Sequence, residues 1–410
     1  MKIKIPSILI VLMLVCAATA GPNLHAVVPP PDGGYPGGNT AEGQNALLSL
    51  TTGGFNTGLG FLSLRSNTTG SFNTAVGAGT LLANTGANNT ATGAGALLSN
   101  TSGFNNTADG TLALFSNTEG DSNTAYGLAA LFANTTGTQN TAVGLSTLTH
   151  NTEGGGNTAV GLIALSNNTT GSANTAVGSN ALGNNDGGNQ NTAVGPFALG
   201  NNVNGSNNIA LGGGAGTGIT TADNVICIGT AGQNVANSCY IGQIFGVTSS
   251  GGTGVFINAD GKLGTATSSL RFKEQITPMD STSEVLFALK PVTFRYKKEI
   301  DPAGLSQFGL VAEEVQKVNP DLVVRDKEGK PYSVRYDQVN AMLLNEFLKE
   351  HRKVEEESRK VEKQETTISQ LGSTVTQQQK QIEALTVGLQ KVSDQLKLSG
   401  PAPRTVADNR

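Results

Sequence analysis

Charge, cysteine and histidine are scarce in this sequence, and each shortage excludes a class of protein. Charged residues make up 14% of the 410 residues, and the stretch from Gly21 to Leu263 holds nine acidic residues and only two basic ones. Because the net charge is -4 and cations are few, no nucleic-acid partner is expected. The three histidines and three cysteines do not fall at metal-ligand spacings, so neither a metal nor a cofactor is expected. The repeats also lack the clustered carboxylates of a glycan-degrading enzyme.

Long apolar segments are missing too, apart from a short run from Ile8 to Val15. This run is shorter than the roughly 18 to 20 residues that a membrane span needs. Lysines precede it and the small residues Ala18-Thr19-Ala20 follow it, which is typical of a secretory signal peptide. Residues 1–20 are therefore predicted to be removed on export, leaving a mature chain that has no transmembrane span and is secreted or held at the cell surface. Residues 21–38, rich in proline and glycine, are predicted to be a flexible linker.

The cysteines leave two interpretations open. Cys16 lies in the predicted leader, where Val15 replaces the small residue that a lipoprotein signal has before its cysteine. Only Cys227 and Cys239 then remain, and export permits a disulfide between them. Free thiols that replace valine or alanine in a repeat are an equally good interpretation.

A repeated unit fills most of the chain after the linker. Its core, Asn-Thr-Ala-x-Gly, recurs at intervals of 17 residues and occasionally 16, which is typical of a solenoid. Each unit has one large apolar residue in common, a leucine that recurs on the same period: Leu64, Leu81, Leu97, Leu114, Leu131, Leu148, Leu165, Leu182 and Leu199. Stacked rungs, spaced by about 4.8 Å, would join these leucines into one narrow core. Residues 39–233 are therefore predicted to form a parallel β-solenoid of about ten rungs, followed by a β neck at 234–267.

Asparagine and glycine occupy the same places in every unit, which favours left-handed turns and stacked amide ladders. The units resemble the head repeats of trimeric YadA-type adhesins over about residues 39–245. This resemblance implies that short β-rungs wind as a parallel roll, that three chains associate and that the rod acts as an adhesin. Its ligand, for example a host surface or a glycan, is not readable from the repeats.

The sequence changes at Ser268-Ser269-Leu270-Arg271-Phe272-Lys273, after which acidic and basic residues are nearly balanced. Serine is a poor nucleophile and needs a base, and a lysine serves if burial or a neighbouring cation depresses its pKa. Lys273 follows Ser268 by five residues, and Arg271 between them supplies such a cation. This spacing alone also occurs by chance in a solvated turn.

The blocks that follow are a helix, strand and turn pattern over 285–296, 308–315, 319–324 and 332–337. Together with the serine-lysine segment, they resemble the intramolecular chaperone domain of phage tail spikes and endosialidases, here at 268–340. That family is a self-cleaving serine peptidase with the motif Ser-Asp-x-Arg-x-Lys. The resemblance implies a small α+β domain that templates a trimer.

The same resemblance implies that Ser268 attacks the bond between Thr267 and Ser268, with Lys273 as general base. Ser269 stands where the family has aspartate, so the alternative is a structural or adhesive trimer whose chaperone domain no longer cuts. Glu313 and Glu314 either tune the site or belong to an ordinary helix surface.

The last part of the chain is predicted to be a long helix. One position is apolar at every seventh residue: Phe347, Val354, Val361, Ile368, Val375, Ile382, Leu389 and Leu396. Leu371, Leu385 and Val392 occupy the complementary position of the heptad. This pattern predicts a parallel coiled coil over 341–398, without deciding between two strands and three, and the alternative is a single helix packed on the domain. Residues 399–410 are predicted to be a disordered tail.

Overall fold

The computed structural model describes residues 35–400. The predicted signal peptide, most of the linker and nearly all of the predicted tail therefore lie outside the described residues. The chain divides into two compact units, Met1–Thr248 and Ser249–Arg410, and each is described by itself.

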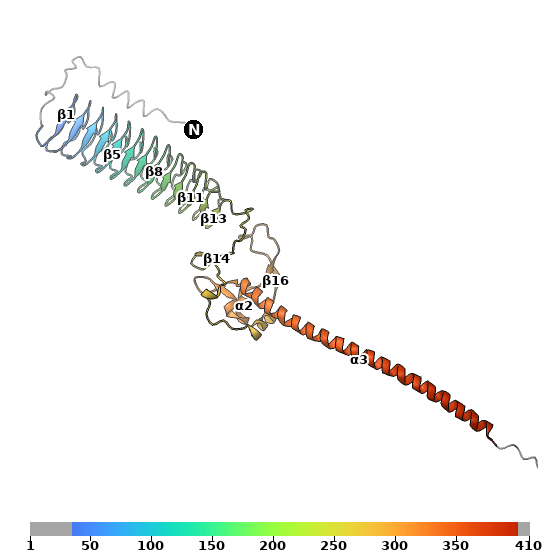
Figure 1. The fold of residues 1–410 in the computed structure, drawn as a ribbon. Helices are drawn as coiled ribbons and strands as arrows, with labels where there is room; N and C mark the ends of the chain where they lie inside the picture. Colours follow the sequence, from blue (N-terminus) through green and yellow to red (C-terminus); the bar gives the residue numbers. More distant parts are fainter. Residues whose placement is uncertain (1–34, 401–410) are drawn as a thin grey trace, which may run out of the picture. The chain divides into compact units, whose positions relative to one another are not determined.

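The first unit is a parallel β-solenoid, as predicted (Figure 1). Thirteen three-residue strands follow one another in sequence order in a single sheet. They are β1 (Thr40–Glu42), β2 (Thr57–Leu59), β3 (Thr74–Val76), β4 (Thr90–Thr92), β5 (Thr107–Asp109), β6 (Thr124–Tyr126), β7 (Thr141–Val143), β8 (Thr158–Val160), β9 (Thr175–Val177), β10 (Thr192–Val194), β11 (Ile209–Leu211), β12 (Ile226–Ile228) and β13 (Cys239–Ile241). The range predicted as a neck contains β13, which is the last strand of this sheet.

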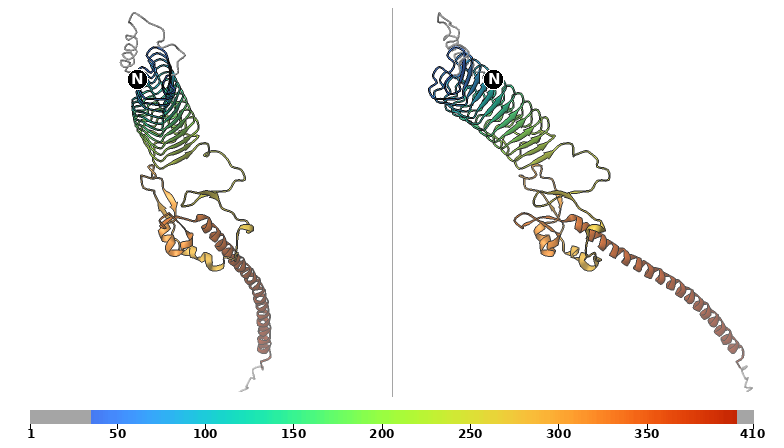
Figure 2. Two further views of the ribbon diagram at one scale, coloured as in Figure 1. Left: turned by 90° about the vertical axis from the view of Figure 1, so that its left-hand side faces the viewer. Right: turned by 60° about the vertical axis from the view of Figure 1, so that its left-hand side comes forward.

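Each strand pairs in register with the equivalent strand of the next rung. Ala125 in β6, for example, pairs with Ala108 before it and Ala142 after it, at intervals of 17 residues. The interval is 16 between β3 and β4 and 13 between β12 and β13, where Ile226 pairs with Cys239. The repeat length in the sequence is therefore the length of one turn of the solenoid, and the rungs stack along one direction (Figure 2).

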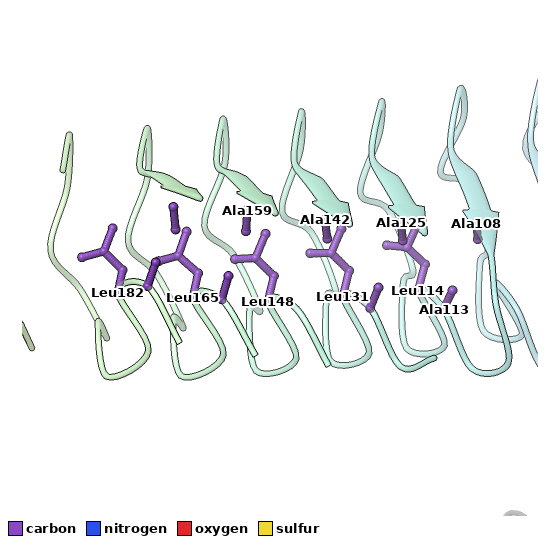
Figure 3. Close-up of a cluster of buried hydrophobic side chains, with 14 of the residues drawn as sticks. Ala108, Ala113, Leu114, Ala125, Leu131, Ala142, Leu148, Ala159, Leu165 and Leu182 are labelled. Carbon is purple, nitrogen blue, oxygen red and sulfur yellow. The ribbon is translucent and has the colours of Figure 1, made fainter. Parts of the chain in front are cut away.

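The core of the solenoid is a row of leucines flanked by alanines (Figure 3). All nine leucines predicted from the period are at most 1% exposed. The middle residue of each strand, usually alanine, points inward, while the first and third residues are more exposed. A rung thus buries little apolar area by itself, and stability depends on each rung covering its neighbours.

The buried leucines adopt left-handed backbone angles, with φ of 51° at Leu114 and 53° at Leu131. Glycine takes positive φ too, as predicted, and at Gly127 a Cβ would approach the carbonyl oxygen of Gly144 to 2.5 Å. The asparagines that open each repeat core do not have positive φ, so the prediction of left-handed asparagine was wrong there. β-branched residues avoid this region more strongly, which favours leucine over valine or isoleucine at the core position, although Ile163 takes φ of 50° elsewhere in its rung.

Those asparagines instead form buried amide ladders. Asn123 illustrates the first ladder. Its backbone N–H donates to Oδ1 of Asn106 at 3.0 Å, and its Nδ2 donates to the carbonyl of Gly137 at 2.8 Å. A second ladder links Asn134 Nδ2 to Asn117 Oδ1 at 2.7 Å. Ladder asparagines are 0–2% exposed. The predicted amide ladders are therefore present, and they satisfy polar groups that the narrow core would otherwise leave unpaired.

The second unit has small antiparallel sheets and one long helix. Its elements are β14 (Val255–Ile257), β15 (Leu263–Thr265), η1 (Leu270–Phe272), η2 (Asp280–Ala288), β16 (Val292–Phe294), β17 (Gln307–Gly309), α2 (Ala312–Val318), η3 (Pro320–Leu322), β18 (Val323–Arg325), β19 (Pro331–Val334) and α3 (Tyr336–Leu398). A small core joins α2, η3, β18, β19 and the start of α3 through Val315, Leu322, Val323, Val334, Val339 and Met342. The predicted order of an α+β part and a long C-terminal helix is confirmed.

Candidate functional site

The predicted dyad lies in a short turn after the β14–β15 hairpin. Leu270–Phe272 forms the 3-10 turn η1, and the backbone N–H of Lys273 donates to the carbonyl of Leu270 at 3.1 Å. This tight turn brings Lys273 Nζ to 3.3 Å from Ser268 Oγ. The structure therefore brings the two predicted catalytic side chains together, within reach of a proton transfer.

Both members of the dyad are exposed in the single chain. Arg271, which the sequence suggested as a cation acting on Lys273, holds its guanidinium over the ring of Phe272, 4.6 Å from the ring centroid. Phe272 and Leu270 are themselves 58% and 75% exposed, so two large apolar side chains surround the dyad without cover. A lysine acts as a base only when neutral, and burial is the strongest way to favour the neutral form. The turn thus supplies proximity but not enclosure.

Ser269 occupies the N-cap position of η1, and its side chain makes no capping hydrogen bond. Its backbone is extended, with φ of -65° and ψ of 139°, which is the usual conformation of a capping residue. Serine and aspartate are about equally strong N-cap residues, but only aspartate brings a negative charge to the N–H groups that open the turn. An aspartate at this position would therefore add this charge interaction to the turn that carries the dyad.

Glu314, one of the two glutamates considered for tuning the site, bonds Lys317 within α2 at 2.6 Å. This hydrogen bond and the charge of Lys317 lower the pKa of the Glu314 carboxyl. Glu314 is therefore engaged on its own helix surface, as in the simpler of the two interpretations. The described residues contain no group of three or more histidine, cysteine or acidic residues arranged to hold a metal ion.

Cys227 and Cys239, the two cysteines among the described residues, are free thiols, so the disulfide interpretation was wrong. Cys227 replaces the inward-facing alanine of its strand and is buried, as its pairing with Ala210 shows. Cys239 begins the next strand, pairs with Ile226 and is exposed. Because neighbouring residues of a strand point to opposite faces, the two thiols lie on opposite sides of the sheet. Burial raises the pKa of the Cys227 thiol.

The helix α3 carries an unpaired apolar seam. We define the seam as its eleven heptad residues Phe347, Val354, Val361, Ile368, Leu371, Val375, Ile382, Leu385, Leu389, Val392 and Leu396, which are 51–71% exposed. Only Val339 and Met342, in the first two turns, are buried. The alternative of a helix packed along the domain is therefore wrong beyond Lys349, the last residue of α3 that bonds to η2. Among the helices of residues 35–400, none combines the length and apolarity that crossing a membrane requires.

Sequence reasoning missed one polar cluster in this unit. Ser283 of η2 is 0% exposed and bonds Asn345 and Glu346 of α3, which lie more than 60 residues away in the chain. Neither side of this contact has a distinctive motif, because a lone serine and an Asn-Glu pair on a helix are common. Only the folded arrangement reveals it.

Comparison with known proteins identifies the C-terminal segment. Residues 268–324 match the family described as chaperone of endosialidase. The match begins at Ser268, includes Lys273 and runs into β18. Comparisons with curated proteins and with solved structures found no match. The resemblance seen in the sequence is confirmed for this segment, and the chain carries a chaperone-of-endosialidase segment behind a β-solenoid.

Proposed function

We propose that this protein is an exported, trimeric fibre whose C-terminal segment templates assembly and then cleaves the chain between Thr267 and Ser268. The observation that carries the proposal is the 3.3 Å approach of Lys273 Nζ to Ser268 Oγ at the first residues of the chaperone-of-endosialidase match. The β-solenoid would be the functional rod, with adhesion as its role. Export rests on the N-terminal sequence alone.

Assembly is supported by the seam on α3. Eleven large apolar side chains that stay more than half exposed along one helix are costly in water, and pairing with the same helix of another copy removes them from it. A parallel coiled coil places equivalent residues of each copy side by side. It would therefore align the copies before long-range contacts between their rods could form in a wrong register.

The chemistry follows from the positions of the two side chains. Neutral Lys273 would accept the hydroxyl proton of Ser268 as Oγ attacks the carbonyl carbon of Thr267. The carbon–nitrogen bond then breaks, and the lysine returns the proton to the amine that becomes the new N-terminus. Water hydrolyses the resulting ester, which leaves a carboxylate on Thr267 and restores the serine hydroxyl.

The exposure of the dyad in a single chain supports cleavage after assembly and not before it. Because Ser268, Lys273, Leu270 and Phe272 are all open to solvent in one chain, a neighbouring copy packed against the turn would exclude water and favour neutral lysine. Cleavage would then follow assembly. Early cutting, which would separate the rod from its template, would be suppressed.

Release after cleavage is supported by the contacts at the junction. Within residues 35–400, no hydrogen bond or ion pair joins residues before 268 to residues after 273, and the small core of the second unit contains no residue before 268. Among these residues, cutting one bond would leave no hydrogen bond or ion pair between the two products, although the β14–β15 hairpin still lines one pocket together with β18 and β19. The rod would remain as a kinetically stable product.

The runner-up function is a trimer assembled by the same segment without cleavage, which Ser269 favours because it leaves η1 uncapped. Ser269→Asp separates the two. If the native chain cuts slowly because the turn is loose, this variant should cut faster. If Ser269 has abolished cleavage, the wild type should stay whole and Ser269→Asp should regain cutting.

The main test uses the full chain, analysed by denaturing electrophoresis and intact mass after expression. We expect two fragments that meet at Thr267 and Ser268, and a single intact chain for Ser268→Ala and for Lys273→Ala. Ser281→Ala and Lys298→Ala change an exposed serine and lysine of the same unit and should cut normally. An uncut wild-type chain would leave the runner-up function.

A further inference from the structure

A buried polar network joins the chaperone segment to the long helix. The Ser283 hydroxyl donates to Oε1 of Glu346 and accepts from Nδ2 of Asn345 at 2.7 Å. Asn345 Nδ2 also reaches the carbonyl of Asp280 at 3.1 Å. Lys349 completes the network, with Nζ 2.7 Å from Glu346 and 3.3 Å from Oε1 of Glu284. We call these six residues the latch.

The latch occupies a different face of α3 from the seam. Val339 and Met342 pack into the small core on the same side as Asn345, Glu346 and Lys349, while Phe347 begins the exposed seam. The side chain of Glu346 is 12% exposed and that of Lys349 is 25% exposed, so the ion pair is partly shielded. One end of α3 is thus held by the domain, and the opposite face is left open for other copies.

A polar contact of this kind fixes position more sharply than an apolar one. Val339 and Met342 would tolerate small shifts, because dispersion and burial have little directionality. The buried hydroxyl of Ser283 and the half-buried amide and carboxylate of Asn345 and Glu346 lose these partners if α3 slides or rotates by one residue, which leaves the hydroxyl unpaired in the interior. Setting the register of a helix is the best supported role of buried polar groups in proteins.

We propose that the latch is a positioning device that fixes the register and direction of the coiled-coil helix relative to the segment that carries Lys273. Six residues separate Lys273 from Asp280, where η2 and the latch begin. Assembly of the helices would therefore set where the dyad of each copy lies. This role rests on the proposed function, although the latch itself is a property of the single chain.

The charge of Glu346 makes the latch sensitive to acid. Its hydrogen bond from Lys349, followed by that from Ser283, lowers the pKa of the Glu346 carboxyl below its usual value. The charged groups around it are Glu284 and Asp280 on η2 and Lys349 and Lys353 on α3. A lowered folded pKa means that the contact stabilises the docked helix above the unfolded value of about 4.3 and is lost as pH falls through the folded value. The latch should therefore open only at pH values below those at which an ordinary glutamate takes up its proton.

The experiment is hydrogen exchange, read by mass spectrometry, on the full chain carrying Ser268→Ala, so that the chain stays whole whether or not the protein can cut itself. Ser283→Ala removes the buried hydroxyl, and Glu346→Gln keeps an acceptor for it but removes the charge. We expect exchange in residues 280–289 and 336–349 to rise together by about tenfold at neutral pH. Glu355→Gln, an exposed glutamate on the same helix outside the seam, should change nothing.

Acidification gives a second measurement on a chain with no change in the latch. Between pH 7 and pH 3.5, after correction for intrinsic exchange, the same two segments should open in the chain with the native latch and in Glu355→Gln. They should already be open in Glu346→Gln. Unchanged exchange in both variants, or an increase spread equally over β18 and β19, would mean that the contact is only one of many structural contacts.

Cleavage then tests the positioning role in chains that keep Ser268. Ser283→Ala and Glu346→Gln should sediment as the wild type does but cut at least several-fold more slowly. Equal cleavage rates would overturn the positioning role while leaving the latch itself intact. If the wild type does not cut, the proposed function fails, and the exchange measurements still decide whether the latch exists.

Discussion

The solenoid and the C-terminal unit satisfy their side chains in opposite ways. Each rung of the solenoid covers the leucine and asparagines of the next, so that a single chain buries them almost completely. The C-terminal unit buries a few residues around Val315 and Leu322 and leaves a seam on α3, the β14–β15 hairpin and the dyad turn in water. The solenoid also leaves apolar side chains such as Phe55, Tyr126 and Leu128 exposed, but its core is closed within one chain, whereas the C-terminal unit leaves a continuous seam that we propose other copies cover.

The largest effect should come from the seam. Changing Ile368 and Val375 together to aspartate places two charges at equivalent positions of consecutive heptads in the proposed interface, where burying an unpaired charge is prohibitive. We expect the full chain to sediment as a monomer and to remain uncut. Ser373→Asp lies on the outer face of the same helix and should leave association unchanged. A double variant that stays oligomeric would show that assembly depends on another surface.

The second-largest effect should come from changing an asparagine of the second amide ladder. Asn134 donates to Asn117 Oδ1 and Gly137 and accepts from Asn151 at 2.8 Å. Asn134→Ala leaves the buried Oδ1 of Asn117 without its donor, while the Gly137 carbonyl keeps the hydrogen bond from Asn123, so the loss should be about 1–3 kcal/mol. The midpoint of solenoid unfolding in denaturant should fall clearly. Thr136→Ala, an exposed residue of the same rung, should leave it within error, and an equal effect of both would contradict the role of the ladder.

A conservative core change should distinguish the two units. Leu131→Val removes one methylene, at a loss of about 1 kcal/mol, and also forces a β-branched residue to φ of 53°, which such residues tolerate less well than leucine. Leu322→Val, in the core of the second unit, carries only the ordinary loss because its backbone is not left-handed. Unfolding in denaturant, followed separately for each unit, should show a larger shift for Leu131→Val. Equal shifts would mean that the backbone conformation does not select leucine.

Much of the fold of both units could be predicted from the sequence, and the features that could not be predicted have physical reasons. The 17-residue period predicted the rungs, because stacking requires equivalent residues at one interval, and the Ser268–Lys273 spacing predicted the pair that η1 brings together. The left-handed leucines were not predictable, because propensity favours asparagine and glycine there and the closed rung overrides it. The Ser283 latch was not predictable either, because it joins residues more than 60 positions apart that have no common pattern.

The smallest effect concerns the 16-residue rung between β3 and β4. Its turn Asn84-Thr85-Gly86 lacks a residue that other rungs have, and Asn84 Nδ2 bonds only the carbonyl of Gly86 in place of also reaching Asn67. The buried Oδ1 of Asn67 consequently has no partner. Inserting a threonine between Thr85 and Gly86 should restore the 17-residue length, satisfy this oxygen and stabilise the solenoid by about 1 kcal/mol. The same insertion between Thr118 and Glu119 lengthens a complete rung to 18 residues and should destabilise. If both insertions shift the unfolding midpoint in the same direction, rung length is not what leaves Asn67 unpaired.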